Sequence, residues 1–385
     1  MTDSEKFDLV VYGATGFTGR LICEHLNTSY GLNGEVNWAM AGRSQSKLEQ
    51  VRDELGLDNS VALLVADTSD QTSVNKLVAS TRVLISAVGP YQQYGSDVVK
   101  ACAENGTDYV DLCGEPAWMH EMIGKYDELA KSNGARIVFS CGFDSIPFDM
   151  GVYFLQQAAQ EKLGGPVPRI KCRVRDMNGM ASGGTVASFM ATMAAAKESP
   201  ELVSILANPF ALTGDFTGPE QPAGDKPIFE DDINSWSGPF IMATINTKNV
   251  HRSNFLLGHQ YGEGLVYDEM VSMGSGKEPA SLGEGMGFDM SLKPGEGPSK
   301  EQREAGYYDI VFYGTASDGQ TIQASVKGDL DPGYGSTSKM IAEAGICLLQ
   351  NTTTAGGCLT SAPAMGAALI ERLQSKAGLV FALEQ

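Results

Sequence analysis

Near the N-terminus, an apolar stretch at 7–12 that favours a β-strand continues directly into a loop with three glycines at three-residue spacing. A helix-like stretch, 20–27, follows at once. In such a strand–turn–helix unit the first glycine permits a tight turn, the second lets backbone amides approach a pyrophosphate, and the third packs the helix on the strand. The helix N-terminus then faces the phosphates. The sequence therefore predicts a dinucleotide-binding loop formed by Gly13, Ala14, Thr15, Gly16, Phe17, Thr18 and Gly19.

The end of the second predicted strand, 36–41, indicates which dinucleotide is bound. Folds specific for NAD(H) carry an acidic residue about 20 residues past the glycines, where it accepts hydrogen bonds from the ribose hydroxyls. Here no carboxylate follows the strand. Arg43 stands there instead, and its guanidinium presents donors that match a 2′-phosphate, with Ser44 and Lys47 within reach. We therefore expect NADP(H), with NAD(H) as the less favoured alternative.

The alternation of strand and helix continues over the first 150 residues. Short apolar stretches predict further strands at 61–66, 83–88, 108–112 and 136–141. Gly106 and Gly134 stand where glycines would end two of the intervening helices. Ser46 with Glu49 predicts a capping box at the start of another. Such alternation is typical of the α/β class, and it predicts a Rossmann fold, a doubly wound parallel sheet with helices on both faces.

The chain of 385 residues is longer than one hydrophobic core usually supports, so we expect two domains. The pattern changes after about residue 150, and the second domain is expected to be rich in strands and to serve substrate binding or oligomerisation, as in a homodimer. Its predicted parts are a strand at 170–174, a helix at 185–197, long loops at 208–239 and 274–306, and a hairpin of 307–315 with 320–327. Two helices, 339–350 and 365–374, and a strand, 379–383, close the chain.

Composition excludes several classes of function. With 28 basic and 47 acidic residues, the formal charge of −19 would repel nucleic acid. The seven cysteines form no Cys-x-x-Cys pair and the four histidines have no paired spacing, so neither a disulfide framework nor a metal site is expected. The longest apolar run is too short for a transmembrane helix. We expect a cytoplasmic protein.

Several residues directly follow predicted strands, at the edge where open α/β sheets bind their ligands. Asp67 could meet the adenine, or it could cap the next helix. A second group of expected cofactor contacts, on the nicotinamide side, consists of Val88, Gly89 and Pro90.

The chemical step is expected at the same edge. Tyr91 could donate a proton or a hydrogen bond, and Asp144 could act as an acid, orient the substrate or cap a helix. For one further candidate, Glu115, a role at a helix start is the alternative because a proline follows it. Substrate contacts are predicted for Tyr94, Glu115, Ser145 and, from the second domain, Arg252.

Taken together, these motifs resemble those of the saccharopine dehydrogenase-like oxidoreductases, a family that includes trans-acting enoyl reductases. Besides the glycine loop, the resemblance rests on the segments 41–43, 88–91 with 94–95, 111–115 with 118, 141–147, 182–185, 252–253, 331–334 and 356–357. It implies nicotinamide chemistry. It also implies that residues 1–150 form an NADP-binding domain completed by 337–385, with 151–336 inserted as the second domain.

The resemblance leaves the substrate open. The more specific hypothesis is NADPH-dependent reduction of a conjugated C=C bond in a lipid-like substrate, and the alternative within the enzymes is reduction of a C=N or C=O bond in a small substrate. A methionine-rich stretch at 185–196 hints at a less polar ligand, although an ordinary packed helix is the favoured explanation of these methionines. A non-catalytic NADP(H)-binding sensor or accessory protein is the alternative from another class.

Overall fold

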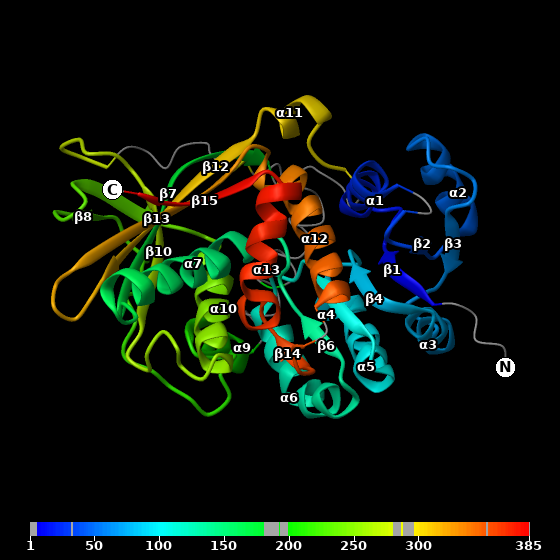
Figure 1. Ribbon diagram of the computed structural model, residues 1–385, viewed down its shortest axis with the longest axis horizontal. Helices are drawn as coiled ribbons and strands as arrows, with labels where there is room; N and C mark the ends of the chain where they lie inside the picture. Colours follow the sequence, from blue (N-terminus) through cyan, green and yellow to red (C-terminus); the bar gives the residue numbers. More distant parts are fainter. Residues whose placement is uncertain are drawn as a thin grey trace.

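Two β-sheets with helices packed on and between them make up the protein in the computed structural model (Figure 1). The structure describes residues 6–31, 34–180, 192, 199–279, 286–287, 296–351 and 353–384. The N-terminal residues build the first sheet, at the right of Figure 1, and the middle of the chain builds the second, at the left.

The first sheet is parallel throughout and has the strand order β14-β6-β5-β4-β1-β2-β3. Its strands are β1 (Phe7–Tyr12), β2 (Trp38–Gly42), β3 (Ala62–Val65), β4 (Thr81–Ser86), β5 (Asp108–Asp111), β6 (Arg136–Val138) and β14 (Gly357–Leu359). The order reverses between β1 and β4, as in doubly wound dinucleotide-binding sheets. The predicted α/β class and Rossmann architecture are confirmed.

Helices cover both faces of this sheet. One face carries α1 (Phe17–Tyr30), α2 (Gln45–Glu54) and α12 (Thr337–Gln350), and the other carries α3 (Gln71–Ala79), α5 (Ser96–Asn105) and α6 (Pro116–Asn133). Gly106 and Gly134 end α5 and α6 in the left-handed conformation, as expected. The predicted capping box at Ser46 is wrong, because Ser44 is the N-cap of α2 and its side chain accepts from the amide of Lys47.

The second sheet is mixed, with the order β15-β13-β12-β7-β10-β9-β8, and β11 pairs with β7 off this path. Its strands are β7 (Arg169–Met180), β8 (Ile228–Glu230), β9 (Ser235–Pro239), β10 (Val266–Ser272), β11 (Met286–Gly287), β12 (Tyr307–Thr315), β13 (Thr321–Gly328) and β15 (Leu379–Glu384). The hairpin of β12 and β13 is confirmed, with Gly319 of its turn at φ +88°.

Three expectations for the second half need correction. We expected all of 337–385 to complete the first sheet, but only α12 and β14 do so directly, because β15 pairs with β13 in the second sheet. The expected loop at 208–239 contains β8 and β9, and the loop at 274–306 contains β11 and α11 (Lys300–Glu304). The helix predicted at 185–197 lies, apart from residue 192, outside the described residues.

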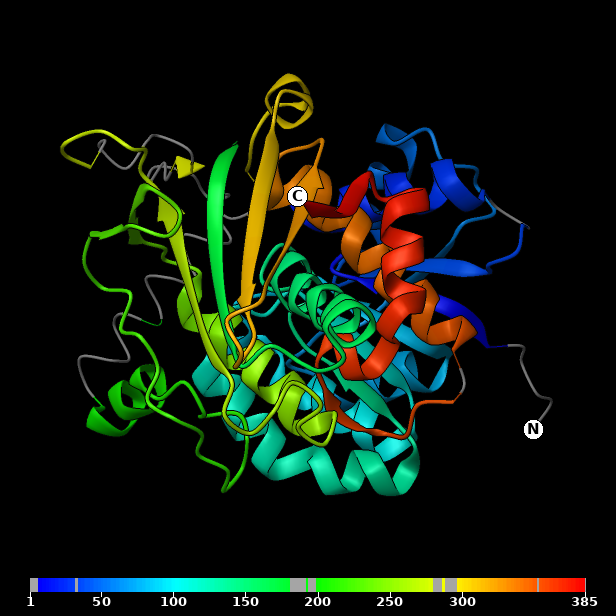
Figure 2. The same ribbon diagram turned by 60° about the vertical axis from the view of Figure 1, so that its left-hand side comes forward.

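Three helices fill the space between the sheets: α7 (Ile146–Leu163), α10 (Ala243–Leu256) and α13 (Ser361–Lys376). Figure 2 shows them packed between the strands of the second sheet and the helices of the first. One continuous hydrophobic core joins both sheets through them, from Leu9 on β1 to Phe312 on β12. The two halves of the chain therefore meet over buried apolar side chains, and a site at their junction is held rigidly.

Buried charges attach the C-terminal helices to α1. Glu343 on α12, fully buried, accepts from His25 at 2.8 Å and from the hydroxyl of Tyr30. Arg372 on α13 donates to the same carboxylate at 3.1 Å. These polar partners hold the pKa of Glu343 below its ordinary value in spite of its burial. A buried carboxylate with several donors can remain ionised at modest cost, so the cluster specifies how the three helices pack.

Candidate functional site

The glycine loop has the geometry that phosphate binding requires. Gly13 has φ +93°, and a Cβ there would lie 3.0 Å from the backbone of Ala87. Gly16 precedes α1, and no side chain among the described residues caps the helix. A Cβ on Gly19 would lie 2.1 Å from the carbonyl oxygen of Gly13, so only glycine allows this closeness of helix and strand. The amides at the start of α1 thus remain available to an anion.

The side chain of Phe17 leaves this loop toward the second half of the chain. Its ring packs edge-on against Tyr334 at a centroid distance of 5.1 Å, and the guanidinium of Arg303 lies 5.6 Å from its centroid. Tyr334 belongs to the π-helical turn η1 (Pro332–Ser336), which precedes α12. Because the ring of Phe17 points away, backbone amides of the loop can face the phosphates. The contacts of Phe17 with Tyr334 and Arg303 hold the loop against the second half of the chain.

Arg43 and Asp67 lie near each other at the ends of β2 and β3. Arg43 and Lys47 are exposed, and Ser44 caps α2. The carboxylate of Asp67 accepts from the amide and hydroxyl of Ser69, and these bonds, with the charge of Arg43, lower its pKa. Asp67 does not cap the next helix, because Asp70 does. An exposed arginine at this position is compatible with a 2′-phosphate.

Replacing Arg43 by alanine should weaken NADPH binding by roughly 10- to 150-fold, because hydrogen bonds to charged groups contribute about 1.5–3 kcal/mol. NADH has no 2′-phosphate, and its affinity should change little. Fluorescence titration of the variant with both cofactors measures this difference, and Arg52→Ala on the following helix α2 is the matched control. Equal losses for NADPH and NADH would show that Arg43 does not contact the 2′-phosphate.

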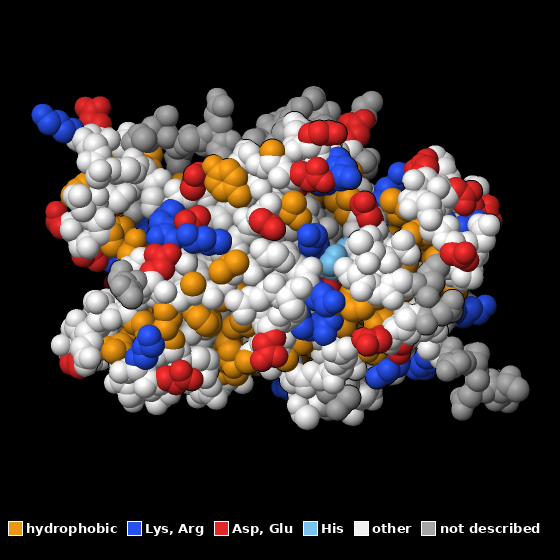
Figure 3. Space-filling view, turned by 45° about the horizontal axis from the view of Figure 1, so that its top comes forward, with side chains coloured by type: hydrophobic (Ala, Val, Ile, Leu, Met, Phe, Trp, Pro, Cys, Tyr) orange, Lys and Arg blue, Asp and Glu red, His pale blue; other side chains and the backbone are white. Residues whose placement is uncertain are grey.

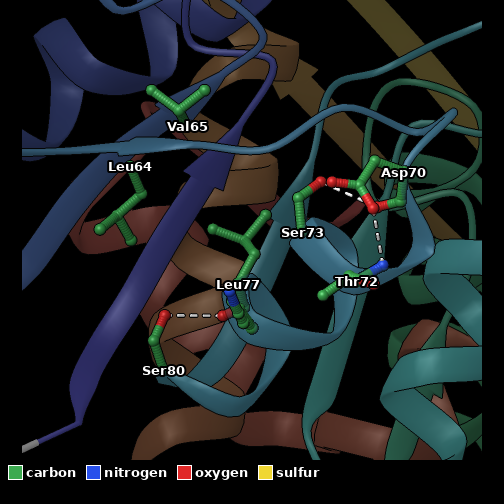
Figure 4. Close-up of a pocket in the computed structure, with 8 residues that line it drawn as sticks. Leu64, Val65, Asp70, Thr72, Ser73, Leu77 and Ser80 are labelled. Atoms are coloured by element: carbon green, nitrogen blue, oxygen red, sulfur yellow. Dashed lines mark hydrogen bonds between the residues drawn. The ribbon is translucent and has the colours of Figure 1, made fainter.

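A surface hollow of about 260 Å³ lies beside the outer strand β3 and helix α3 (Figure 4). Leu64 and Leu77 contribute apolar walls, and Asp70 and Ser73 lie near the start of α3, joined by a hydrogen bond of 2.8 Å. None of the predicted site residues lines this hollow. It therefore adds nothing to the candidate site.

After β4, the segment of Val88, Gly89 and Pro90 leads into the short helix α4 (Tyr91–Tyr94). The carboxylate of Glu115 accepts from the backbone amides of Tyr91, at 2.9 Å, and Gln92, at 2.8 Å. Glu115 thereby anchors the start of α4 to the end of β5.

Tyr91 is buried below this edge. Its hydroxyl donates to the carbonyl of Ser86 at 3.0 Å and accepts from the amide of Leu112 at 3.0 Å. Burial, together with the charge of Asp111, raises its pKa well above the ordinary value. These contacts favour a positioning role for Tyr91 over proton donation. Tyr94, by contrast, is 40% exposed at the end of α4.

Asp144 lies in the turn between β6 and α7, at the carboxyl edge of the first sheet. The side chain is half-buried, but its Oδ1 is fully buried and has no hydrogen-bond partner within the described ranges. Burial raises its pKa to about 7. A carboxyl group that holds its proton near neutral pH can act as a general acid.

The next residue, Ser145, links this turn to the second half of the chain. It is buried, and its Oγ accepts from Nδ2 of Asn249 on α10 at 2.8 Å. One turn earlier on the same helix, Asn246 donates to Glu269 on β10 at 2.9 Å. The sequence did not point to Asn246 or Asn249, because a helix as polar as 246–254 normally lies at the surface. Here it is buried between the sheets.

Arg252, predicted to contact substrate, also lies on this buried helix but has other partners. Its guanidinium donates to the carbonyl oxygens of Leu212 and Cys358. It is 2% exposed and joins α10 to β14. Of the predicted site residues, Asp144 and Ser145 thus lie in the turn before α7. Arg252 is buried against backbone carbonyls, and Tyr94 is exposed at the end of α4.

The cysteine thiols lie inside the protein. All seven cysteines are buried and free, and burial raises the pKa of Cys141 well above its ordinary value.

Within the described ranges, no group of three His, Cys, Asp or Glu side chains is arranged to hold a metal ion. The helices that the structure describes include none long and apolar enough to cross a membrane. On the face shown in Figure 3, acidic side chains are spread widely among the basic ones.

Comparison with known proteins agrees with the fold and the predicted family. The saccharopine dehydrogenase NADP-binding domain matches residues 9–138. A Mycobacterium tuberculosis protein is 38% identical over 403 residues, 96% of this chain and 95% of its own length. The trans-acting enoyl reductase of Mycobacterium ulcerans is 35% identical over 96% of each chain. The saccharopine dehydrogenase of Saccharomyces cerevisiae, at 11% identity, has the same fold, with a TM-score of 0.58 over 98% of this chain and 99% of that one.

Proposed function

Because this chain belongs to the saccharopine dehydrogenase-like family and is an NADP-dependent oxidoreductase, we propose that it reduces the conjugated C=C bond of a lipid-like enoyl substrate with NADPH. The observation that carries the proposal is Asp144. A carboxyl group with a buried oxygen that has no hydrogen-bond partner among the described residues lies at the edge of the sheet where the nicotinamide of such folds is bound. The relatives named trans-acting enoyl reductase favour C=C over C=N or C=O.

In this proposal the glycine loop binds the pyrophosphate and Arg43 the 2′-phosphate. Bound NADPH supplies a hydride to the carbon β to the carbonyl. Asp144 donates a proton to the α-carbon, so that the double bond is saturated and Asp144 is left as a carboxylate. Ser145, fixed by Asn249, positions the turn that carries Asp144.

The partners of Arg252 support an apolar substrate. The arginine that we expected to contact substrate, Arg252, donates to backbone carbonyls. This supports an acyl chain over an amino acid, whose carboxylate would need a cation.

A substrate panel tests the proposal. Purified protein is mixed with NADPH and 2-enoyl thioesters of increasing chain length, ketones, or a keto acid with an amine, and loss of NADPH absorbance is followed. We expect turnover of the enoyl thioesters, with the saturated product identified by mass. Turnover of a ketone or imine alone would reassign the bond reduced. NADPH binding without any turnover would favour a sensor.

A further inference from the structure

Ser145 and Asn249 form a polar pair inside the protein, where the carboxyl edge of the first sheet meets helix α10. Each of the two side chains is only 2% exposed. Nδ2 of Asn249 donates to Oγ of Ser145 at 2.8 Å. Ser145 belongs to the turn between β6 and α7, and Asn249 lies about 100 residues further along the chain, so the pair exists only because the two halves of the chain pack together.

This pair has one donor and one acceptor that no bond uses. Because Oγ of Ser145 accepts from Asn249, its own proton is free to be donated, and no hydrogen bond to a described residue takes it. Oδ1 of Asn249 is buried and has no hydrogen-bond partner among the described residues. Oδ1 and Nδ2 belong to the same planar amide, so the free acceptor lies next to the free donor.

A purely structural role leaves these two atoms unexplained. Ser145 is the N-cap residue of α7, where a serine ordinarily accepts from an amide of the first turn, but its side chain makes no capping bond. Asn254, also buried on α10, has both ends of its amide paired. Its Nδ2 donates to the carbonyl of Gly262 at 2.8 Å, and its Oδ1 accepts from the amide of Tyr261 at 2.9 Å. A buried amide oxygen without a donor costs stability, and a ligand that supplies the donor removes this cost.

Asn246 resembles Asn249 but is attached to a different part of the protein. It lies three residues earlier, on the same face of α10, and its Oδ1 also has no partner in the described ranges. Its Nδ2 donates to Glu269 on β10, a strand of the second sheet. Asn249 is bonded instead to a residue that follows a strand of the first sheet. Of the two asparagines, Asn249 is therefore the one joined to the edge where a dinucleotide lies.

The position of Ser145 in the first sheet indicates the nicotinamide half of the cofactor. In doubly wound sheets the dinucleotide crosses the carboxyl edge where the strand order reverses, with its pyrophosphate at the glycine loop. Arg43, the proposed partner of the 2′-phosphate, follows β2 on one side of that point. The other half of the cofactor then extends over β4, β5 and β6. Ser145 stands in the turn after β6.

We propose that Ser145 and Asn249 bind the carboxamide of the nicotinamide ring. A primary carboxamide presents a carbonyl oxygen beside an N–H group, which complements the free donor and the free acceptor of the pair. The hydroxyl of Ser145 donates to the carboxamide oxygen, and Oδ1 of Asn249 accepts from the carboxamide nitrogen. Two bonds to one group fix how the ring is turned, and so which of its faces meets the substrate. Ser145 thus contacts the cofactor, in place of the substrate contact expected from its position in the sequence.

Binding of three ligands separates the two bonds. They are NADP⁺, its 3-acetylpyridine analogue, in which a methyl group replaces the amide nitrogen, and 2′-phospho-ADP-ribose, which has no nicotinamide ring. The unsubstituted protein should prefer NADP⁺ to the analogue by about 2- to 10-fold, the usual contribution of one neutral hydrogen bond. Asn249→Ala should lose this preference, because NADP⁺ weakens and the analogue does not. Ser145→Ala should weaken NADP⁺ and the analogue alike, since both carry the carbonyl oxygen. Isothermal titration measures all three affinities.

Affinity for 2′-phospho-ADP-ribose distinguishes a lost contact from a damaged fold. It should stay the same in both variants, and a loss parallel to that of NADP⁺ would overturn the proposal. Equal affinities of the unsubstituted protein for NADP⁺ and the analogue would also overturn it, without any substitution.

Asn254→Ala is the matched control. It removes a buried asparagine of α10 whose amide is fully paired, so it should lower the unfolding temperature and leave the ratios of the three affinities unchanged. If it abolishes the preference for NADP⁺ as Asn249→Ala does, the contact with Asn249 is excluded. No substrate takes part in these titrations, so their outcome is independent of which bond the enzyme reduces.

Discussion

Replacing Asp144 by asparagine is expected to lower kcat by about 10²- to 10⁴-fold, the contribution that a positioned general acid typically makes. Asparagine has nearly the same shape but cannot donate the proton. NADPH affinity should stay close to its original value, because the glycine loop and Arg43 are untouched. Steady-state kinetics with an enoyl thioester, together with a cofactor titration, measure both quantities. A kcat near that of the unsubstituted enzyme would exclude Asp144 as the proton donor.

The same substitution should leave the fold intact, which separates lost chemistry from lost structure. The carboxyl of Asp144 keeps its proton up to about pH 7 when folded, against an ordinary pKa of 3.8 when unfolded. The folded state therefore binds more protons between these values, and stability falls as pH rises through that window. Asparagine does not ionise, so the variant does not lose this stability as the pH rises. We expect Asp144→Asn to unfold at an equal or higher temperature than the unsubstituted protein at pH 8, with a smaller difference at pH 5.

A second buried aspartate provides the matched control. Asp149 lies one turn further on, in α7, and burial raises its pKa to about 6. Its Oδ2 accepts from the amide of Ala362, which ties α7 to α13. Asp149→Asn should change stability rather than chemistry, so kcat should remain close to that of the unsubstituted enzyme. A comparable loss of kcat in both variants would mean that burial alone, and not the position of Asp144, makes a carboxyl essential.

Local patterns allowed much of the first sheet to be predicted. The glycine loop, the strand alternation and the glycines that end α5 and α6 depend on neighbours within a few residues, and a single sequence contains that information. The pairing of β15 with β13 does not follow from local pattern, because it depends on how two segments separated in sequence meet. An apolar strand such as 379–383 fits either sheet equally well.

The site was predictable in position but only partly in role. Residues that follow parallel strands must lie at the carboxyl edge, which placed Glu115 and Asp144. The role of each carboxyl group depends on its tertiary contacts. Glu115 accepts from two backbone amides, whereas Oδ1 of Asp144 has no hydrogen-bond partner in the part of the chain that the structure describes. Asn249 was missed because it stands in the second domain with no motif around it. Only the packing of α10 brings it to Ser145.

Replacing Gly19 by alanine is expected to abolish tight NADPH binding. The added Cβ would lie 2.1 Å from the carbonyl oxygen and 2.7 Å from the carbonyl carbon of Gly13, and 2.9 Å from Cα of Ala14. These are backbone atoms of the phosphate loop, so rotation of a side chain cannot relieve the clash. Helix α1 or the loop must shift instead. Overpacking of this kind costs about 1–3 kcal/mol or more. The shift displaces the amides that would hold the pyrophosphate. The substitution should therefore lower NADPH affinity more than it lowers the stability of the fold.

Gly124→Ala is the control that isolates this effect. Gly124 lies inside α6, and a Cβ there would meet no atom within 4 Å. The same chemical change in a helix interior should therefore stabilise the protein slightly, by up to about 1 kcal/mol. Isothermal titration with NADPH and thermal unfolding of both variants give the comparison. If Gly19→Ala binds NADPH as tightly as Gly124→Ala does, the close packing of α1 on β1 is not what positions the phosphate loop, and the pyrophosphate must be held elsewhere.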